Sequence, residues 1–412
     1  MVTCRGAARA RRAAAGRKML QQEIGCFMDT DAEGPSQPYP RPLPVLRAVI
    51  DSIDREILQL LSRRNGLVGE IAACKRQGRL AIRDFQRERE LIEDRRRRAA
   101  GLGLSPEQTE SLFRLILWGS RDRQAALKAE VPPDIEPRAV AIIGGHGKMG
   151  QCMARLFGDL GHRVMIADLD TGLTPQQAAA NADVVVISVP IDATVDVIRQ
   201  VGPEVAKDAL LMDVTSVKAA PLKAMLESTK ANVVGTHPLF GPTVHSLQGQ
   251  RVVLCPGRGD TWLDWVRQTF RSRGLAVVES AAEDHDRIMA VVQVLVHFST
   301  EVMGRTLARL GVAIDKTLAF MSPIYLIELI MTARHFAQAP QLYASIQMAN
   351  PATADVTRAF LDAAEELDRL AASKDHPGFE RMFDEVGAFF GSFTDQAMEQ
   401  SSFLIDRLVE RA

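Results

Sequence analysis

The segment Ala139–Gln151, AVAIIGGHGKMGQ, constrains the fold more strongly than any other part of the chain. In it, an apolar run passes directly into Gly145, Gly147 and Gly150, which have the spacing G-x-G-x-x-G. Glycines at this spacing let the backbone approach a pyrophosphate at the N-terminus of the following helix. The motif alone is a weak signal, but a strand pattern precedes it and a helix pattern follows it. That context predicts a dinucleotide-binding fold.

The end of the second predicted strand, HRVMIAD, bears on which nicotinamide cofactor binds. This strand ends at Asp168, close to the spacing of about 20 residues at which an acid hydrogen-bonds the ribose diol and repels a 2′-phosphate. The sequence therefore predicts NAD, held by the three glycines together with Lys148, Met149 and Asp168. The alternative interpretation of Asp168 is a turn residue ahead of LDTG.

Further apolar strands follow, ADVVVISVPI, ALLMDVTSVK, ANVVGTHPLFGP and RVVLCPG, and they alternate with helical segments. This alternation is typical of a doubly wound, mostly parallel sheet, so residues 137–282 are predicted to form a Rossmann-type domain. Ligands of such sheets bind at the carboxyl ends of the strands, where Ser188 and His237 lie. His237 is interpreted as catalytic, and a structural cap before a proline is the alternative.

Nearly a third of the chain precedes the glycine loop. Residues 1–44 are rich in Arg, Ala and Pro, and we expect a disordered N-terminal extension there. An upstream start codon, with the natural start at Met28, is a second interpretation of this composition. The Arg- and Ala-rich part, which lacks acids, also has the character of an organelle transit peptide, and this is the third interpretation.

Residues 45–130 are predicted to form a domain of three helices. Apolar residues at three- and four-residue intervals predict one long amphipathic helix that ends near Gly78. A second helix should begin after Asp84 as its N-cap, and a third is opened by Ser105. Three such helices cannot bury their apolar stripes well alone, so we expect this domain to intertwine with a second copy.

Basic residues on the first of these helices suggest an anion site. Arg64 and Lys75 lie near one face of the helix, three turns apart, and two cations near apolar positions suit a small dianion. Arg47 lies about 25 Å from Arg64 along the axis, so it would reach the same anion only from a partner chain. Taken singly, each of the three would more often be a solvated surface charge.

The rest of the chain and its composition restrict the class of protein. Residues 283–412 have Phe and Leu at helical spacing, which is typical of a core or an interface, and we expect a helical dimerisation domain. The net charge of -1 gives no reason to expect nucleic acid or an anionic membrane as partner. The five scattered cysteines favour a reducing cytoplasm and no metal site, and no apolar run is long enough to span a membrane.

The segment Val45–Lys128 resembles the all-helical chorismate mutase family through LRAVIDSIDREILQLLSRR, AACK, RDFQRERE and ILWGSRDRQ. The resemblance implies that the cations hold the carboxylates and the ether oxygen of chorismate, and that Glu88 accepts the substrate hydroxyl. It also implies that Gln124 donates to the ether oxygen. Such a rearrangement needs no nucleophile, only a held conformer and stabilised charge. The matched positions are Arg47, Arg64, Lys75, Asp84, Arg87, Glu88, Ser120 and Gln124.

The order of GGHGKMG, SVPI, DVTSVK and THPLFGP is similar to that in prephenate dehydrogenases, and the likeness continues to about Asp406. With the mutase segment ahead of it, the chain resembles the family of bifunctional chorismate mutase–prephenate dehydrogenases of tyrosine biosynthesis. The resemblance implies that His237 accepts a hydrogen bond from the ring hydroxyl of prephenate, that Ser188 shares this hydroxyl and that Arg334 holds a carboxylate. Further implied substrate-site residues are His285, His297 and Tyr343.

The resemblance leaves several points open. Enteric members carry Arg where this chain has Val296, so an anion contact is lost there or supplied by another residue. His245 is interpreted as structural. Tyrosine is a candidate inhibitor acting within the dehydrogenase region. The alternatives to a bifunctional enzyme are an arogenate dehydrogenase with an attached mutase, a non-catalytic regulatory dimer that binds NAD and a metabolite, and an inactive mutase that serves as a dimer clamp.

Overall fold

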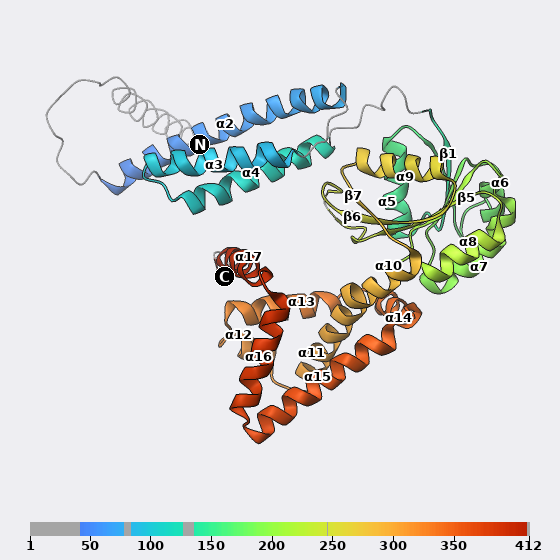
Figure 1. Ribbon diagram of the computed structural model, residues 1–412. Helices are drawn as coiled ribbons and strands as arrows, with labels where there is room; N and C mark the ends of the chain where they lie inside the picture. The colour runs from blue at the N-terminus through green and yellow to red at the C-terminus, as the bar shows by residue number, and fades with distance from the viewer. Residues whose placement is uncertain (1–41, 78–83, 127–135, 245, 410–412) are drawn as a thin grey trace, which may run out of the picture. The chain divides into compact units, whose positions relative to one another are not determined.

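The computed structural model describes residues 42–77, 84–126, 136–244 and 246–409 (Figure 1). The expectations for the N-terminal extension, for Gly78 as a helix cap and for His245 lie outside these residues. Two units can be distinguished, one ending at Leu80 and one beginning at Ala81, and each is described by itself.

The described part of the first unit is the single helix α2 (Leu43–Gln77). At a rise of about 1.5 Å per residue, its 35 residues extend about 50 Å, as the apolar spacing predicted. Large apolar side chains along it remain open to solvent, among them Ile50 at 56%, Leu58 at 65% and Leu67 at 58% exposure. A single chain therefore leaves much of this helix's apolar surface uncovered.

The second unit begins with helices α3 (Phe85–Gly101) and α4 (Pro106–Ala126), which pack against each other. The carboxylate of Asp84 accepts a hydrogen bond from the amide of Arg87 at 2.9 Å, so Asp84 caps α3 as predicted. Ser105 Oγ accepts from the amide of Gln108 at the start of α4. Arg96 of α3 also binds carboxylates on α4, and these contacts fix the pairing of the two helices.

A seven-stranded sheet follows, with the order β2-β1-β3-β4-β5-β6-β7. All neighbouring strands are parallel except the pair β5 and β6, so the predicted doubly wound sheet is confirmed. The strand order reverses direction at β1 and β3, and a ligand crevice is expected at such a switch point. The strands are β1 (Ala139–Ile143), β2 (Arg163–Ala167), β3 (Val184–Ile187), β4 (Leu210–Asp213), β5 (Asn232–Pro238), β6 (Arg251–Arg258) and β7 (Ala276–Glu279).

Helices cover both faces of this sheet, as Figure 1 shows. On one face, α5 (Lys148–Asp159) and α9 (Asp260–Ser272) bury an apolar cluster that includes the ring of Phe157. The other face carries α6 (Pro175–Ala180), α7 (Ile191–Val201) and α8 (Ala219–Ser228), with the 3-10 turn η1 (Gly202–Glu204) after α7. The sheet core is therefore apolar on both sides, and polar groups concentrate at the strand ends.

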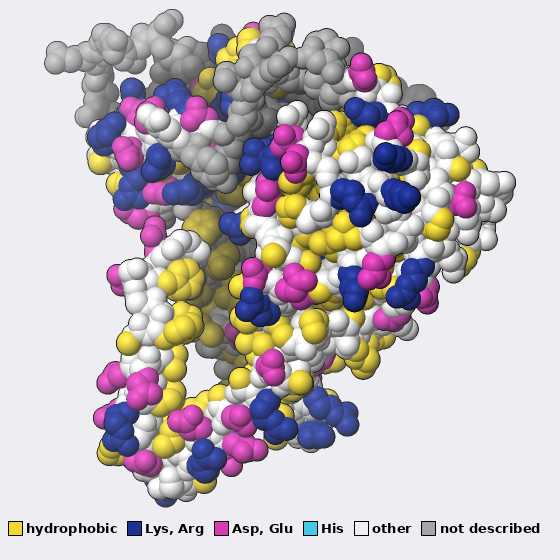
Figure 2. Space-filling model, turned by 45° about the vertical axis from the view of Figure 1, so that its right-hand side comes forward, with side chains coloured by type: hydrophobic (Ala, Val, Ile, Leu, Met, Phe, Trp, Pro, Cys, Tyr) yellow, Lys and Arg dark blue, Asp and Glu magenta, His cyan; other side chains and the backbone are white. Residues whose placement is uncertain are grey.

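The C-terminal region is helical, as predicted. It comprises α10 (Ala282–Met289), the π-helical turn η2 (Ala290–Leu295), α11 (Val296–Leu310), α12 (Ile314–Leu318), α13 (Pro323–Phe336), α14 (Pro340–Ala349), α15 (Thr353–Ser373), α16 (His376–Phe390) and α17 (Phe393–Val409). Large apolar side chains are open to solvent here, including Phe320 at 92% and Phe389 at 84% exposure, and Figure 2 shows such side chains at the surface. Monomeric proteins rarely expose so much apolar surface.

A polar contact joins helix α14 of the helical region to the sheet domain. Ser345 Oγ of α14 donates to the carboxylate of Asp192 of α7 at 2.8 Å, and α14 packs on α7.

No helix within the described ranges is long and apolar enough to cross a membrane. Those ranges also hold no cluster of three or more His, Cys, Asp or Glu side chains that could bind a metal ion.

Candidate active site

The glycine loop follows β1 and leads into α5. Gly144 has a φ of +81°, and a Cβ atom at this position would lie 2.4 Å from the carbonyl oxygen of Ser188. A Cβ at Gly150 would lie 2.4 Å from the carbonyl oxygen of Gly144. The N-cap of α5 is Gly147, with no side-chain hydrogen bond to the first turn. The loop is thus a close-packed backbone cradle at a helix N-terminus, which fits a pyrophosphate.

Asp168 follows β2 and faces this loop. One carboxylate oxygen accepts from the amide of His146 at 2.8 Å, and the other accepts from the amide of Leu169 at 2.8 Å. Its own amide is bonded to Thr171 Oγ1, so Asp168 also begins a turn. Each carboxylate oxygen has two lone pairs, so these bonds leave acceptor capacity for a ribose hydroxyl. The turn interpretation and the cofactor interpretation are therefore compatible.

Ser188 comes directly after β3, beside the glycine loop. Its amide donates to the carbonyl of Ile143 at the end of β1 at 2.8 Å, and its own carbonyl lies against Gly144. The end of β3 and the loop that follows β1 therefore meet at the switch point of the sheet.

His237 lies at the carboxyl end of β5 and is 2% exposed. Its Nδ1 lies 2.9 Å from Nε2 of His285 on α10, and its Nε2 lies 3.3 Å from the side-chain nitrogen of Gln293 in the π-helical turn. Burial lowers the pKa of His237 well below its usual value, and the positive charge of Lys218 and the neighbouring His285 lower it further. His237 is therefore a neutral imidazole near pH 7, able to accept a proton.

A buried ion pair supports the strand that carries His237. Lys218, which is fully buried, donates from Nζ to the carboxylate of Asp213 and to the carbonyl of Thr236 at 2.7 Å. Asp213 also accepts from the amide of Thr215 at 3.0 Å. These bonds tie the end of β4 to β5 directly next to His237. Both charged residues belong to the segment DVTSVK. An acid and a lysine next to an apolar strand were therefore the sequence signal for this buried ion pair.

Both ring nitrogens of His285 face protein groups. It is 2% exposed, its Nδ1 lies 2.8 Å from the carboxylate of Asp286, and its Nε2 contacts His237. Protein partners thus contact both ring nitrogens of His285, and the contact with substrate expected for it stays a prediction.

A group of rings lies further along the helices that carry the site. The ring of His297 on α11 meets Tyr343 edge-on with centroids 4.8 Å apart, and Tyr343 lies 3.9 Å from the ring of His335. Burial lowers the pKa of His297, with a further contribution from His335. Burial also raises the pKa of Tyr343, while Arg334 acts in the opposite direction.

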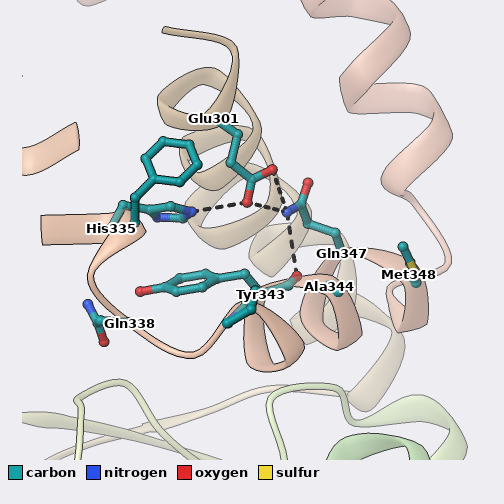
Figure 3. A pocket seen from close by; sticks show the side chains of 9 residues that line it. Glu301, His335, Gln338, Tyr343, Ala344, Gln347 and Met348 are labelled. Atoms are coloured by element: carbon teal, nitrogen blue, oxygen red, sulfur yellow. Dashed lines mark hydrogen bonds and ion pairs between the residues drawn. The ribbon is translucent and has the colours of Figure 1, made fainter. Parts of the chain in front are cut away.

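A cavity of about 330 Å³ opens beside these rings (Figure 3). The carboxylate of Glu301 accepts from His335 Nε2 at 3.0 Å and from Gln347 Nε2 at 2.9 Å in its wall. Sequence analysis identified Tyr343 here but missed Glu301, His335 and Gln347, because single polar residues on helices carry no spacing signal.

In the helical pair α3 and α4, the candidate mutase residues have local partners. Glu88 accepts from Arg121 Nη1 at 2.6 Å, and both side chains are 18% exposed. Ser120 Oγ donates to the carbonyl of Ile116. The side-chain oxygen of Gln124 is buried and has no hydrogen-bond partner among the described residues. A buried acceptor of this kind requires an explanation, and a polar ligand that donates a hydrogen bond to it is one.

The other expected mutase residues are distributed as follows. Asp84 caps α3, and Arg87 is an exposed side chain 3.8 Å from Glu90. The three expected cations of α2 differ in burial, since Arg47 is exposed while Arg64 and Lys75 are half-buried. Arg121 was not anticipated, although the motif ILWGSRDRQ contains it.

A doubly wound sheet, a glycine cradle at its switch point and a buried neutral histidine at a strand end define a dinucleotide-dependent dehydrogenase. Family models agree with this class and extend it. Chorismate mutase type II matches residues 46–125, the nucleotide-binding domain of prephenate dehydrogenase matches 161–279 and the dimerization domain of prephenate dehydrogenase matches 281–385.

Known proteins are similar over most of the chain. The T-protein of Haemophilus influenzae is 34% identical over 88% of this chain and 96% of its own length. The T-protein of Enterobacter agglomerans is 35% identical over 88% of this chain and 97% of its own length. A solved prephenate dehydrogenase from A. aeolicus, in complex with hydroxyphenyl propionate and NAD+, has the same fold, with a TM-score of 0.53 and 19% identity over 63% of this chain and 99% of its own.

The chain belongs to the T-protein family. It is a bifunctional enzyme of tyrosine biosynthesis that joins a chorismate mutase to an NAD-dependent prephenate dehydrogenase. The predicted family, both predicted activities and the predicted cofactor are thereby confirmed.

Proposed function

We propose that the dehydrogenase reaction takes place at Nε2 of His237. The observation that carries this assignment is a buried imidazole with a lowered pKa at the carboxyl end of β5. Its Nδ1 is bonded within the protein, so Nε2 is the nitrogen that can receive a proton from a substrate hydroxyl. Oxidising a carbon that bears a hydroxyl requires an acceptor for that proton as the carbonyl forms.

The substrate of this site is prephenate, whose ring hydroxyl bonds to His237. Bound NAD would supply the hydride acceptor for oxidation at the hydroxyl-bearing carbon, and loss of carbon dioxide from across the ring would make the ring aromatic. Ser188 shares the hydroxyl, because the end of β3 borders the glycine loop. Arg334 holds a substrate carboxylate, and His297 and Tyr343 form the wall beyond Gln293, since His297 follows one turn later along the same helical run.

The cofactor is held by the loop after β1 and by the end of β2. Gly145, Gly147 and Gly150 allow the backbone to approach the pyrophosphate, and the first turn of α5, with Lys148 and Met149, faces it. Asp168 accepts from the adenosine ribose with the acceptor capacity that its two amide contacts leave.

The mutase reaction takes place among the polar side chains of the N-terminal helices. Glu88 accepts the hydroxyl of chorismate and Gln124 donates to its ether oxygen. The enclosed Glu88–Arg121 pair supports a polar ligand there. Arg64 and Lys75 hold carboxylates, Arg47 reaches the site from a second chain, and the remaining contacts come from Asp84, Arg87 and Ser120.

The assembly is a homodimer, and the exposed apolar faces of α2 and of the C-terminal helices support this. The domains are residues 45–130, 137–282 and 283–412, after an extension of residues 1–44. Tyrosine is a candidate inhibitor that would act within the dehydrogenase region. A cytoplasmic location accords with a biosynthetic role.

A two-stage assay on the full-length protein tests these assignments. Chorismate consumption without NAD measures the mutase alone, and NADH formation with supplied prephenate measures the dehydrogenase alone. Arogenate in place of prephenate tests the competing substrate, and we expect prephenate to have the higher kcat/KM. A higher kcat/KM with arogenate would overturn the substrate assignment, while no turnover of either would favour a regulatory dimer.

A further inference from the structure

Three side chains form a buried line that ends at the proposed proton acceptor. The carboxylate oxygen Oδ1 of Asp286 lies 2.8 Å from Nδ1 of His285. Nε2 of the same ring lies 2.9 Å from Nδ1 of His237. Asp286, His285 and His237 are each 2% exposed, so water does not compete for these bonds.

The carboxylate at the far end of this line is held in place. Its Oδ1 accepts from the amide of Lys218 at 2.7 Å and its Oδ2 from the amide of Ala219 at 2.9 Å. These amides begin helix α8, whose N-terminus favours negative charge. The backbone carbonyl of Asp286 accepts from the side chain of Asn350 at 2.8 Å.

The ionisation state of Asp286 follows from these contacts. Burial alone would raise the pKa of Asp286, but the hydrogen bonds from His285 and from the amides of Ala219 and Lys218 bring it below its usual value. Near pH 7 the group is therefore a carboxylate, which can only accept hydrogen bonds.

The direction of each bond in the line can now be assigned. Since Asp286 accepts, His285 donates from Nδ1–H, and an imidazole that carries its one proton on Nδ1 has a lone pair on Nε2. His237 must then donate from Nδ1–H, which leaves its own Nε2 as the acceptor. The side-chain amide nitrogen of Gln293, 3.3 Å from that atom, is a donor and suits the same assignment.

We propose that Asp286 is a positioning residue for the dehydrogenase, which acts through His285 to fix His237 in the tautomer that presents an unprotonated Nε2 to the substrate. This inference rests on the proposed role of His237 as proton acceptor. Asp286 touches no substrate. Without it, the ring of His285 can turn its donor toward His237, and His237 would then carry its proton on the wrong nitrogen.

The test compares Asp286→Asn and His285→Gln with the unmodified full-length enzyme. The first variant keeps the shape of the side chain but lacks the second acceptor oxygen, and the second breaks the line while Asp286 still caps α8. We expect kcat with prephenate to fall on the order of 10²-fold, less than the ~10⁴-fold loss found when a carboxylate that directly orients a catalytic histidine becomes an amide. KM for prephenate and NAD should stay within about twofold, because no binding group is removed.

A spectroscopic readout separates positioning from structural support. With ¹⁵N-labelled histidine, the His237 signals, assigned by their loss in His237→Asn, should indicate Nδ1–H in the unmodified enzyme and a shift toward Nε2–H in both variants. As a matched control, Thr174→Val removes the side-chain cap of α6 on the same face of the sheet. It should leave both kcat and the His237 tautomer unchanged.

The outcomes are distinct. An unchanged His237 tautomer and an unchanged kcat in His285→Gln would overturn the inference, even if Asp286→Asn failed to fold. A changed tautomer with full turnover would instead overturn the role of His237 as acceptor, and with it the basis of the inference. If kcat fell to a similar extent in Asp286→Asn and in the Thr174→Val control, loss of a helix cap would explain the result, and Asp286 would have no positioning role.

Discussion

Replacing His237 with asparagine tests the dehydrogenase most directly. Asn has a polar group of similar reach but cannot take up a proton, and it removes neither the glycine cradle nor Arg334. Loss of a general base typically lowers turnover about 10²- to 10⁴-fold, which corresponds to about 3–5 kcal/mol in the barrier. Because His237 is 2% exposed, bulk water is a poor substitute for its imidazole as the proton acceptor. We expect the upper part of that range.

The pH profile provides a second, independent result. Only neutral His237 accepts a proton, so kcat/KM of the unmodified enzyme should fall as the pH drops through the pKa of His237. That pKa lies well below the usual 6.5, chiefly because of burial, so the rate should remain flat on going from neutral pH to 6.5 and fall only at lower pH. In His237→Asn this acidic limb should be absent.

The assay follows NADH formation with saturating NAD and with prephenate well below its KM, so that the rate reports kcat/KM, from about pH 4 to about pH 9. Chorismate mutase activity serves as the internal control, since the substitution lies in the sheet domain. Full turnover of His237→Asn, or an acidic limb that persists unchanged, would refute the assignment, and His297 would then be the next candidate to test.

Three further predictions concern the cofactor and the mutase. Gly150→Ala should abolish NAD binding, measured by fluorescence titration, because its Cβ would lie 2.4 Å from the carbonyl oxygen of Gly144, whereas mutase activity should persist. Asp168→Asn should narrow the preference for NAD over NADP in kcat/KM by removing repulsion of the 2′-phosphate; equal use of both cofactors by the unmodified enzyme would contradict this. Lys75→Ala should lower mutase activity at least tenfold, from loss of a charge-assisted contact of roughly 1.5–3 kcal/mol. Mixing it with Arg47→Ala should restore some activity through hybrid dimers, and no rescue after confirmed subunit exchange would indicate a site within one chain.

The parts of the fold that could be predicted share one property: they are long apolar runs bounded by clear turn signals. The strand before Gly144 and the strand that carries His237 near its end are such runs. Strand β7 was missed because its run AVVE is only four residues long and is mostly exposed at the sheet edge. Edge strands of this kind are specified by pairing with a neighbour, which a single segment does not reveal.

The candidate site could be predicted from the sequence where its residues lie at strand ends or within motifs. Ser188 and His237 were found because parallel strands bring their carboxyl ends to one edge. The contribution of Asp286 could not be read from the sequence, because an acid on a helix resembles a solvated surface charge until its burial is known. The partners of His285 were hidden for the same reason, since sequence does not show which groups contact its ring nitrogens.

The π-helical turn Ala290–Leu295 has an evolutionary consequence. A π-helical turn spans about one residue more than an α-helical turn, so it can be gained or lost by inserting or deleting a single residue. Deleting exposed Val292 would close the run into regular helix. The helical faces on either side would keep their relative orientation, but the carboxamide of Gln293 would rotate away from His237. Change in chain length, rather than substitution, is thus a route by which descendants of this enzyme could remodel the surroundings of the imidazole.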